Sequence, residues 1–292
     1  MTVTRDRVPH LSASNQSRQP NSTTWHWHNW EGLPYLTCSL LDAWPHGFFT
    51  QNFSPKTPSD LVKILHSQSR VYRVKQVHGN IVLKTSEIRP FSTPEDSAIT
   101  ADESISKTLA EADGIITEKE LEAVWVCSAD CVPVLIADAE TGKVAAVHAG
   151  WRGTAAKIVP EAIAHFVASG SQIANLRVAL GPAIAGKVYQ VSLDVAIQLG
   201  VTIAPKPTNP AELLEFLQQL PDAPVSPDTE PGKIRLDVRR FNVLQLEQLG
   251  VTIEQIAIAP ECTYSNPTHF FSYRRDGQKK VQWSGIVSHK NS

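Results

Sequence analysis

The sequence VPVLIADAETGKVAAVHAGWRGTAAK, residues 132–157, contains two apolar runs separated by a short polar segment. The runs Val132–Ala137 and Lys143–Val147 are short and aliphatic, which is typical of strands. Because only Asp138–Gly142 joins them, and its Glu-Thr-Gly favours a turn, we expect the two strands to pair antiparallel. A helical pattern follows over Gly153–Ser169, with apolar residues close to a 3.6-residue spacing. This stretch therefore predicts strands and a helix in immediate succession.

Strands and helices alternate along the rest of the chain as well. Further strands are expected at Arg70–Gln76, Glu122–Cys127, Leu176–Leu180 and Gln255–Ala259, and further helices at Pro58–Ser67, Ser192–Leu199 and Val238–Leu249. Alternation of this kind indicates an α/β or α+β fold with layered packing. The antiparallel pair described above makes a mixed sheet the expected arrangement.

Two segments fall outside this alternation. Residues 1–24 are rich in Ser, Asn and Gln and have little to bury, so we expect a disordered N-terminal tail. The remaining residues, 25–292, are expected to form a single domain. Within it, Pro205–Lys233 is rich in Pro and Asp and reads as an insertion that contains a short helix, Pro210–Gln219.

The composition narrows the classes of partner. The 292 residues are 42% hydrophobic and carry a net charge of −2, which gives no reason to expect nucleic acid or an anionic membrane as a partner. No apolar run approaches the roughly 20 residues of a membrane span, and the polar N-terminus lacks the apolar stretch of a secretory signal. Four Cys in so long a chain do not suggest a disulfide framework and fit a reducing cytoplasm.

Three residues of metal-binding type stand at the ends of apolar runs. His148 ends the second run quoted above, His78 follows VYRVKQV, and Cys131 lies between AVWV and VPVLIAD. One thiolate and two imidazoles would form a zinc set that leaves the fourth tetrahedral position open, as catalytic zinc sites do. Asp130, next to Cys131, would either orient the metal ligands without binding the metal itself or transfer a proton as a general acid or base.

Each of these residues also has a simpler interpretation. A histidine at the end of a strand commonly serves as a hydrogen-bonding residue, and a free cysteine is commonly buried as a small hydrophobe. Cys127 competes with Cys131 as a ligand, although it is more typical of a buried strand residue. No pair of these residues has the spacing of a zinc finger or of His-Glu-x-x-His, so spacing alone does not decide.

Six segments occur in an order that resembles one protein family. They are KQVHGN (75–80), EADGIIT (111–117), SADCVPVLIAD (128–138), VHAGWRGT (147–154), LGP (180–182) and CTYSNPTHFFSYRRDG (262–277). Together they are similar to the purine nucleoside phosphorylase family formerly called polyphenol oxidase or laccase-domain proteins. The resemblance implies a fold similar to that of bacterial toxin deamidases, a layered α/β sandwich with mixed sheets flanked by helices.

The resemblance also implies an activity for residues 25–292 as one catalytic domain. That activity is zinc-dependent phosphorolysis of adenosine, inosine and methylthioadenosine, together with deamination of adenosine. The family's metal ligands are the His of QVHG, the Cys of ADC and the His of HAGWRG, which match His78, Cys131 and His148. Purine nucleosides and phosphate are the implied partners, and both a monomer and a homodimer remain open.

The loop after His148 is suited to an anion. Gly150 and Gly153 would let the backbone turn close to a ligand, and a helix that begins near Gly153 would offer unpaired N–H groups and a positive dipole end. Arg152 could then clamp a phosphate through two hydrogen bonds. The alternatives are a structural salt bridge for Arg152 and a core position for Trp151.

Further substrate contacts are expected from the segment near the C-terminus. Arg274 and Arg275 are candidates for charged contacts, and Tyr264 and Phe271 are candidates for stacking on a purine. All four also suit structural or core roles.

Several rival functions have some support in the sequence. GPAIAGKV (181–188) nearly matches a phosphate-binding P-loop, but Val188 replaces the Ser or Thr that holds magnesium. His26-Trp27-His28 resembles a copper ligand pair and leaves a copper-dependent polyphenol oxidase open, although a multicopper centre needs several such pairs and the sequence has one. A zinc hydrolase that edits peptidoglycan precursors would use the same ligands. A non-catalytic binding module is the alternative of a different class.

Overall fold

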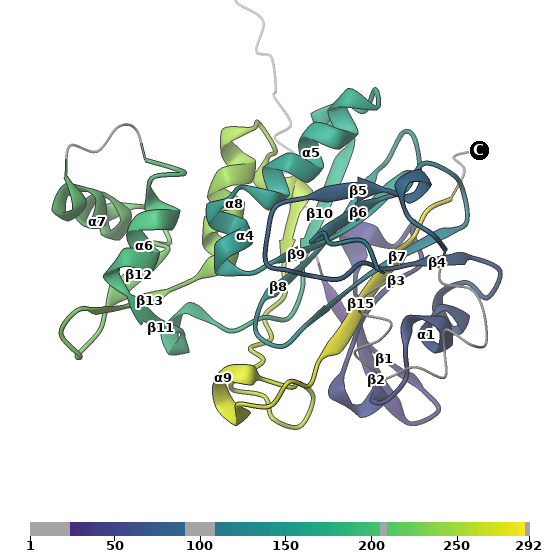
Figure 1. Cartoon of the computed structure of the whole chain (residues 1–292), viewed down its shortest axis with the longest axis horizontal. Helices are drawn as coiled ribbons and strands as arrows, with labels where there is room; N and C mark the ends of the chain where they lie inside the picture. Colours follow the sequence, from purple (N-terminus) through teal and green to yellow (C-terminus); the bar gives the residue numbers. More distant parts are fainter. Residues whose placement is uncertain (1–23, 91–108, 205–208, 290–292) are drawn as a thin grey trace, which may run out of the picture.

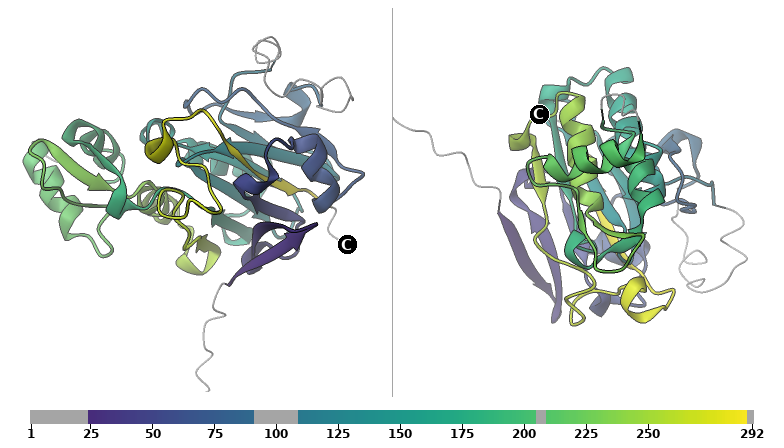
Figure 2. Two further views of the ribbon diagram at one scale, coloured as in Figure 1. Left: turned by 90° about the horizontal axis from the view of Figure 1, so that it is seen from below. Right: turned by 90° about the vertical axis from the view of Figure 1, so that its left-hand side faces the viewer.

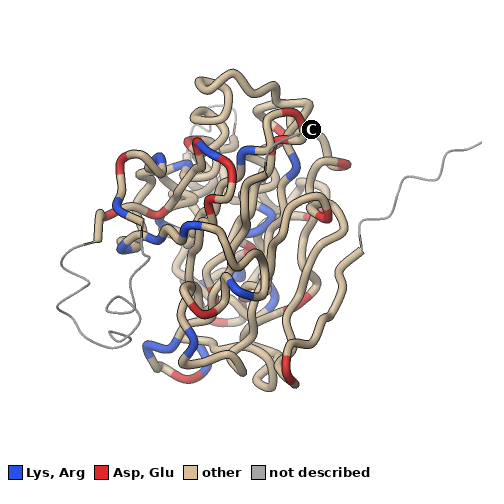
Figure 3. Tube along the Cα trace, turned by 90° about the vertical axis from the view of Figure 1, so that its right-hand side faces the viewer, with Lys and Arg blue, Asp and Glu red and all other residues tan. Residues whose placement is uncertain are grey.

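The computed structural model describes residues 24–90, 109–204 and 209–289. Two six-stranded sheets form the body of the molecule, and a third sheet of three strands stands to one side (Figure 1). No helix among these residues is long and apolar enough to cross a membrane. Lys and Arg are interspersed with Asp and Glu along the side of the molecule that Figure 3 shows.

The first large sheet has the order β1-β2-β3-β15-β7-β4. Its strands are β1 (Trp25–Trp30), β2 (Leu33–Cys38), β3 (His46–Phe49), β15 (Gln282–Val287), β7 (Glu122–Ser128) and β4 (Arg70–Tyr72). Only the β4–β7 pair is parallel. Because β15 lies between β3 and β7, the last strand of the chain joins its N-terminal hairpin to the rest of the sheet.

The second large sheet has the order β14-β10-β8-β9-β6-β5. Its strands are β14 (Ile256–Ile258), β10 (Leu176–Leu180), β8 (Val132–Asp138), β9 (Val144–Ala149), β6 (Gly114–Ile116) and β5 (Val82–Lys84). The predicted antiparallel pairing of β8 with β9 is confirmed, while β10–β14 and β5–β6 are parallel. This sheet is therefore mixed, as expected.

The side chains of β8 show how the layers are stacked, because successive residues of a strand face opposite sides of a sheet. Val134 and Ile136 join the core beneath the helices, whereas Leu135 and Ala137 join the core between the two large sheets. The helices on the first side are α4 (Trp151–Ala155), α5 (Ile158–Ala168) and α8 (Val238–Gln248), and α1 (Pro58–Leu65) covers the outer face of the other sheet. The predicted layered sandwich of mixed sheets flanked by helices is confirmed.

The third sheet, of order β11-β13-β12, carries its own helices and extends away from the body (Figure 2). Its elements are β11 (Gln190–Ser192), α6 (Leu193–Gly200), α7 (Pro210–Gln219), β12 (Val225–Pro227) and β13 (Lys233–Leu236). Leu213 and Leu236 belong to the same hydrophobic cluster as Val134 of β8. The core of this lobe is therefore continuous with that of the body, and α7 is the helix expected within Pro205–Lys233.

Several predicted boundaries were wrong. The helix expected over Gly153–Ser169 begins two residues earlier and breaks between α4 and α5, where Lys157 has a φ of 62°. Pro160 explains the break, because it has no N–H group to donate to the carbonyl of Ala156 four residues earlier. The Asn80 side-chain amide donates to that carbonyl instead, at 2.9 Å.

Two further limits also moved. The strand expected over Arg70–Gln76 ends at Tyr72, and the Gln76 side chain instead exchanges two hydrogen bonds with the backbone of Cys127. The expected tail reaches to residue 24, but Thr24 already pairs with Ser39. Residues 1–23 lie outside the described part of the chain, so the tail itself stays a prediction. The sequence analysis did not predict β1, β2, β3 and β15 of the first sheet, β5 and β6 of the second, or any strand of the third.

Candidate metal centre

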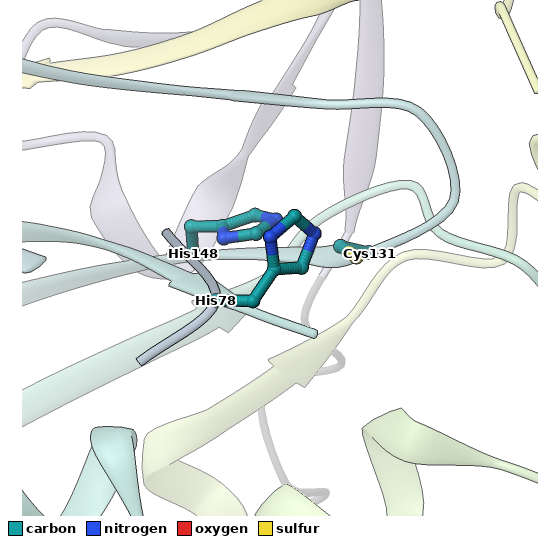
Figure 4. A group of neighbouring side chains, drawn as sticks. All are labelled: His78, Cys131 and His148. Carbon is teal, nitrogen blue, oxygen red and sulfur yellow. The ribbon is translucent and has the colours of Figure 1, made fainter. Parts of the chain in front are cut away.

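His78, Cys131 and His148 come together although they lie on separate parts of the chain (Figure 4). Cys131 occupies the turn between β7 and β8, His148 lies in β9, and His78 lies in the loop between β4 and β5. The antiparallel register of β8 and β9 pairs Pro133 with His148, which brings the residue before β8 to the same edge. One ligand atom from each of the three residues lies within 4.8 Å of the others. We call this group the metal centre.

A buried carboxylate that the sequence reasoning missed, Asp113, orients two of these three residues. Its Oδ1 lies 2.8 Å from Nδ1 of His148, which leaves Nε2 of that ring for a metal. The backbone N–H groups of Val77, His78 and Gly79 also donate to this carboxylate, at 2.7–3.2 Å. Burial raises the pKa of Asp113, but these hydrogen bonds outweigh burial, so the pKa lies below its usual value.

The electrostatics of the metal centre favour a thiolate. Burial raises the pKa of the Cys131 thiol, but the charges and hydrogen bonds of His148 and His78 outweigh it and lower the pKa to about 6. For His148 burial lowers the pKa, whereas the Cys131 charge and the Asp113 hydrogen bond raise it to about 9. The thiol of Cys127, in contrast, has its pKa raised to about 12 by burial. The thiolate, which is the form that binds metal ions, is thus favoured at Cys131 and disfavoured at Cys127.

The two glycines of the following loop are needed for close approach. A Cβ atom on Gly150 would lie 2.9 Å from Sγ of Cys131 and 3.3 Å from the ring of His78. A Cβ atom on Gly153 would lie 2.9 Å from the carbonyl oxygen of Gly79, in the loop that carries His78. Because both glycines lack a side chain, the backbone of this loop can pack directly against Cys131 and the loop that carries His78.

Asp130 and His78 have uncommon backbone conformations, with φ angles of 96° and 61°. Positive φ angles at residues other than glycine concentrate at functional sites, where the surrounding contacts hold them. At His78 these contacts are the three N–H groups bound to Asp113. At Asp130 the buried carboxylate accepts a hydrogen bond from the Thr263 hydroxyl at 2.6 Å and another from the backbone N–H of Arg274 at 2.7 Å.

Arg152 belongs to α4, which starts directly after Gly150. Its side chain is exposed, and the guanidinium carbon lies 4.4 Å from the ring centroid of Trp151. Trp151 is half-buried and packs against the core beneath the helices. The predicted helix start near Gly153 was wrong, and α4 is only five residues long.

The other predicted contact residues lie in and near α9 (Tyr273–Asp276). Arg275 donates five hydrogen bonds within its own segment, to the carbonyls of Thr263, Tyr264 and Phe270 and to Asp276. These bonds give Arg275 a structural use, and Arg274 is the better candidate for a ligand contact. Tyr264 and Phe271 are half-buried, and the ammonium of Lys280 lies 5.8 Å from the ring of Phe271.

A family model described as multi-copper polyphenol oxidoreductase laccase matches residues 57–288, which is most of the chain. The chain belongs to this family. A purine nucleoside phosphorylase from Synechocystis sp. is 50% identical over 267 residues, which cover 91% of this chain and 97% of that protein. A purine nucleoside phosphorylase from Mycobacterium tuberculosis is 30% identical over 229 residues, or 78% of this chain and 81% of the relative. The predicted resemblance is confirmed.

Two solved structures share the fold of this chain. The crystal structure of YlmD from Geobacillus stearothermophilus matches with a TM-score of 0.69 at 24% identity and covers 90% of this chain and 99% of that one. A hypothetical protein, YfiH, from Bacillus licheniformis matches with a TM-score of 0.67 at 24% identity, covering 88% and 96%.

The two rival sites that the sequence analysis argued against lie in the described part of the chain. GPAIAGKV (181–188) ends in a 3₁₀ turn, Gly186–Val188, and β11 comes next, so the segment lacks the helix of a P-loop. His26 and His28 lie on the edge strand β1 with ring centroids 6.5 Å apart. Among the described residues, His78, Cys131 and His148 are the one group of three that could hold a metal ion.

Proposed function

We propose that the protein is a zinc-dependent purine nucleoside phosphorylase that also deaminates adenosine. The observation that carries this proposal is the metal centre, in a chain whose 50%-identical relative is named purine nucleoside phosphorylase. Adenosine, inosine and methylthioadenosine are the proposed nucleosides, and inorganic phosphate is the proposed co-substrate. The proposal goes beyond the family description, which names copper and polyphenols.

The donor set supports zinc. Cys131 and the two histidines provide one sulfur and two nitrogens, and a catalytic zinc commonly has three protein ligands and one open position. The hydrogen bond from Nδ1 of His148 to Asp113 fixes the ring in the orientation that such a ligand needs. When bound, zinc supplies a Lewis acid beside the reacting group.

In phosphorolysis, a phosphate oxygen forms a bond to the anomeric carbon of the ribose while the bond from that carbon to the purine nitrogen breaks. The products are ribose 1-phosphate and the free base. Arg152 is proposed to hold the phosphate, because its guanidinium is exposed and fixed against Trp151 at the start of α4. Deamination replaces the purine amino group with oxygen from water and releases ammonia, so it does not need phosphate.

The test is to incubate the purified protein with adenosine, with and without phosphate, and to identify the products by mass spectrometry. We expect adenine and ribose 1-phosphate only with phosphate, and inosine in both reactions. Metal-stripped protein should lose both activities and regain them with zinc. Recovery with copper alone, together with oxygen consumption on a phenol, would support the oxidase instead and would overturn the proposal.

A further inference from the structure

The two adjacent arginines of α9 are used very differently. All the hydrogen bonds of the Arg275 guanidinium described above stay within its own segment. The Arg274 side chain is exposed, and toward the described residues it donates one hydrogen bond, from Nη1 to the carbonyl oxygen of Gln190 at 2.8 Å. Because a guanidinium has five N–H donors, most of those of Arg274 have no hydrogen-bond acceptor among the described residues.

Three contacts hold Arg274 in place despite its exposure. Its backbone N–H donates to Oδ2 of Asp130, its guanidinium carbon lies 4.7 Å from the ring centroid of Tyr189, and Nη1 binds Gln190 as above. The backbone carbonyl of Asp130 also accepts from the N–H of Ile184 at 3.0 Å, in the segment that leads to Tyr189. Asp130, the residue before Cys131, therefore holds the backbone of Arg274 and also the backbone of the segment that leads to Tyr189.

Arg152 shows the same construction on α4. Its guanidinium also lies over an aromatic ring, that of Trp151, and α4 begins after Gly150, whose backbone approaches Cys131. Both arginines lie near Tyr189. Burial and, after it, the Cys131 charge raise the pKa of Tyr189, the charges of Arg274 and Arg152 lower it, and the net result is a pKa of about 12. Two exposed guanidiniums, each stacked on a ring, thus lie near the metal centre and near one tyrosine.

We propose that Arg152 and Arg274 together form a subsite for a tetrahedral oxyanion beside the metal centre, with Asp130 and Tyr189 as positioning residues for Arg274. Two planar forks suit an anion with several equivalent oxygens, and stacking limits the freedom that each side chain would lose on binding. The subsite rests on the proposed function in one respect, that inorganic phosphate is its natural occupant.

This assignment changes the role expected for Asp130. Both of its carboxylate oxygens already accept hydrogen bonds, from Thr263 and from the backbone of Arg274. A group committed in this way positions other residues, and proton transfer to the substrate is then not its role. Its replacement should weaken phosphate use more than it slows the turnover of the saturated enzyme.

The main test compares Arg274→Gln with Lys280→Gln, which removes one positive charge from an exposed position of the same C-terminal segment. For Arg274→Gln the KM for phosphate should rise roughly thirtyfold, while the KM for inosine changes less than about threefold and the zinc content stays normal. Lys280→Gln should leave both KM values near those of the wild type. An unchanged phosphate KM in Arg274→Gln would overturn the subsite.

Variants of the positioning residues separate their role from mere stability. Tyr189→Phe keeps the ring and should preserve the phosphate KM, whereas Tyr189→Leu should raise it about fivefold or less, in line with the loss of one cation–π contact. Asp130→Asn should raise the phosphate KM with kcat changed by less than about fivefold. A large loss of kcat at unchanged phosphate KM would instead make Asp130 a proton carrier and contradict its positioning role.

Direct binding distinguishes a failure of the subsite from a failure of the proposed function. Titration calorimetry with inorganic phosphate, without nucleoside, should give binding to the wild type and roughly thirtyfold weaker binding to Arg274→Gln. If the wild type binds phosphate in this way but releases no base, the phosphorylase is wrong and the subsite stands. If phosphorolysis occurs and Arg274→Gln binds phosphate normally, the function stands and the subsite is wrong. If adenosine monophosphate binds and inorganic phosphate does not, the proposed occupant is wrong.

Discussion

The candidate metal centre and the proposed two-arginine subsite are built from different kinds of structure. In the second large sheet, Cys131 directly precedes the buried strand β8 and His148 lies in the buried strand β9, where the fully buried Asp113 orients it. Arg152 and Arg274 stand on helices of five and four residues and keep exposed side chains. Two of the three candidate ligands are thus positioned by strands, and the third, His78, is an exposed loop residue whose backbone is held by Asp113. The two arginines, which are proposed to meet a soluble ligand, are carried by short surface elements.

The largest expected effect is a difference in alkylation rate between two cysteines of the candidate metal centre region, Cys131 and Cys127, which are four residues apart. In metal-free protein at pH 7, Cys131 should be mainly thiolate, because its pKa is lowered to about 6, whereas that of Cys127 is raised to about 12. Iodoacetamide should therefore label Cys131 at least about a hundredfold faster. The rate should fall as the pH drops through about 6, where the thiolate takes up a proton. Mass spectrometry of the labelled peptide measures both sites, and equal labelling would contradict these electrostatics.

A second large effect should follow from replacing the carboxylate behind the ligands. Asp113→Asn should weaken zinc binding roughly 10- to 100-fold, as losses of such supporting groups commonly do. Asp138→Asn is the matched control, since Asp138 is equally buried at the other end of β8 and binds Thr141 and Glu140. Competition with a zinc chelator gives both affinities. Weakening of equal size in the control would mean that general stability, not ligand orientation, is being measured.

Replacing an arginine of the proposed subsite should impair the use of phosphate without changing the zinc content. Arg152→Ala should reduce phosphate-dependent release of adenine roughly thirtyfold at limiting phosphate, because a charge-assisted contact to phosphate is lost. Formation of inosine from adenosine uses water and should change much less, and zinc content should stay normal. Both products are measured in one reaction. An equal loss of both would show that Arg152 shapes the whole site.

Features with a local sequence pattern could be predicted, whereas contacts between residues far apart in the sequence could not. The three residues of the metal centre stand at the ends of apolar runs, and β8, β9 and α7 are strongly patterned, so all could be located in advance. Asp113 was missed because EADG shows a charge beside apolar residues without showing what it binds. Tyr189 was missed because its contact with Arg274 joins positions 85 residues apart, across the small lobe and α9. The break at Lys157 follows from Pro160, which is visible in the sequence, but the Asn80 side chain that bonds the freed carbonyl of Ala156 comes from 76 residues earlier.

The smallest effect is expected from shortening the N-terminal segment, which is not part of the candidate metal centre or of the proposed arginine subsite. Removing residues 1–22, which keeps Thr24 and its pairing with Ser39, should leave zinc content, turnover and melting temperature nearly unchanged. The reason is the polar composition of this segment, which offers little apolar surface to the core. Thermal unfolding and the adenosine assay would check this. A drop of several degrees in melting temperature would place the domain boundary earlier.

The most direct test of the account is the zinc content of purified wild type, Cys131→Ala and Cys127→Ala, measured by inductively coupled plasma mass spectrometry beside the adenosine assay. We expect about one zinc per chain in the wild type and in Cys127→Ala, and loss of most of the metal and of both activities in Cys131→Ala. Full zinc occupancy in Cys131→Ala, or full activity without metal, would contradict it.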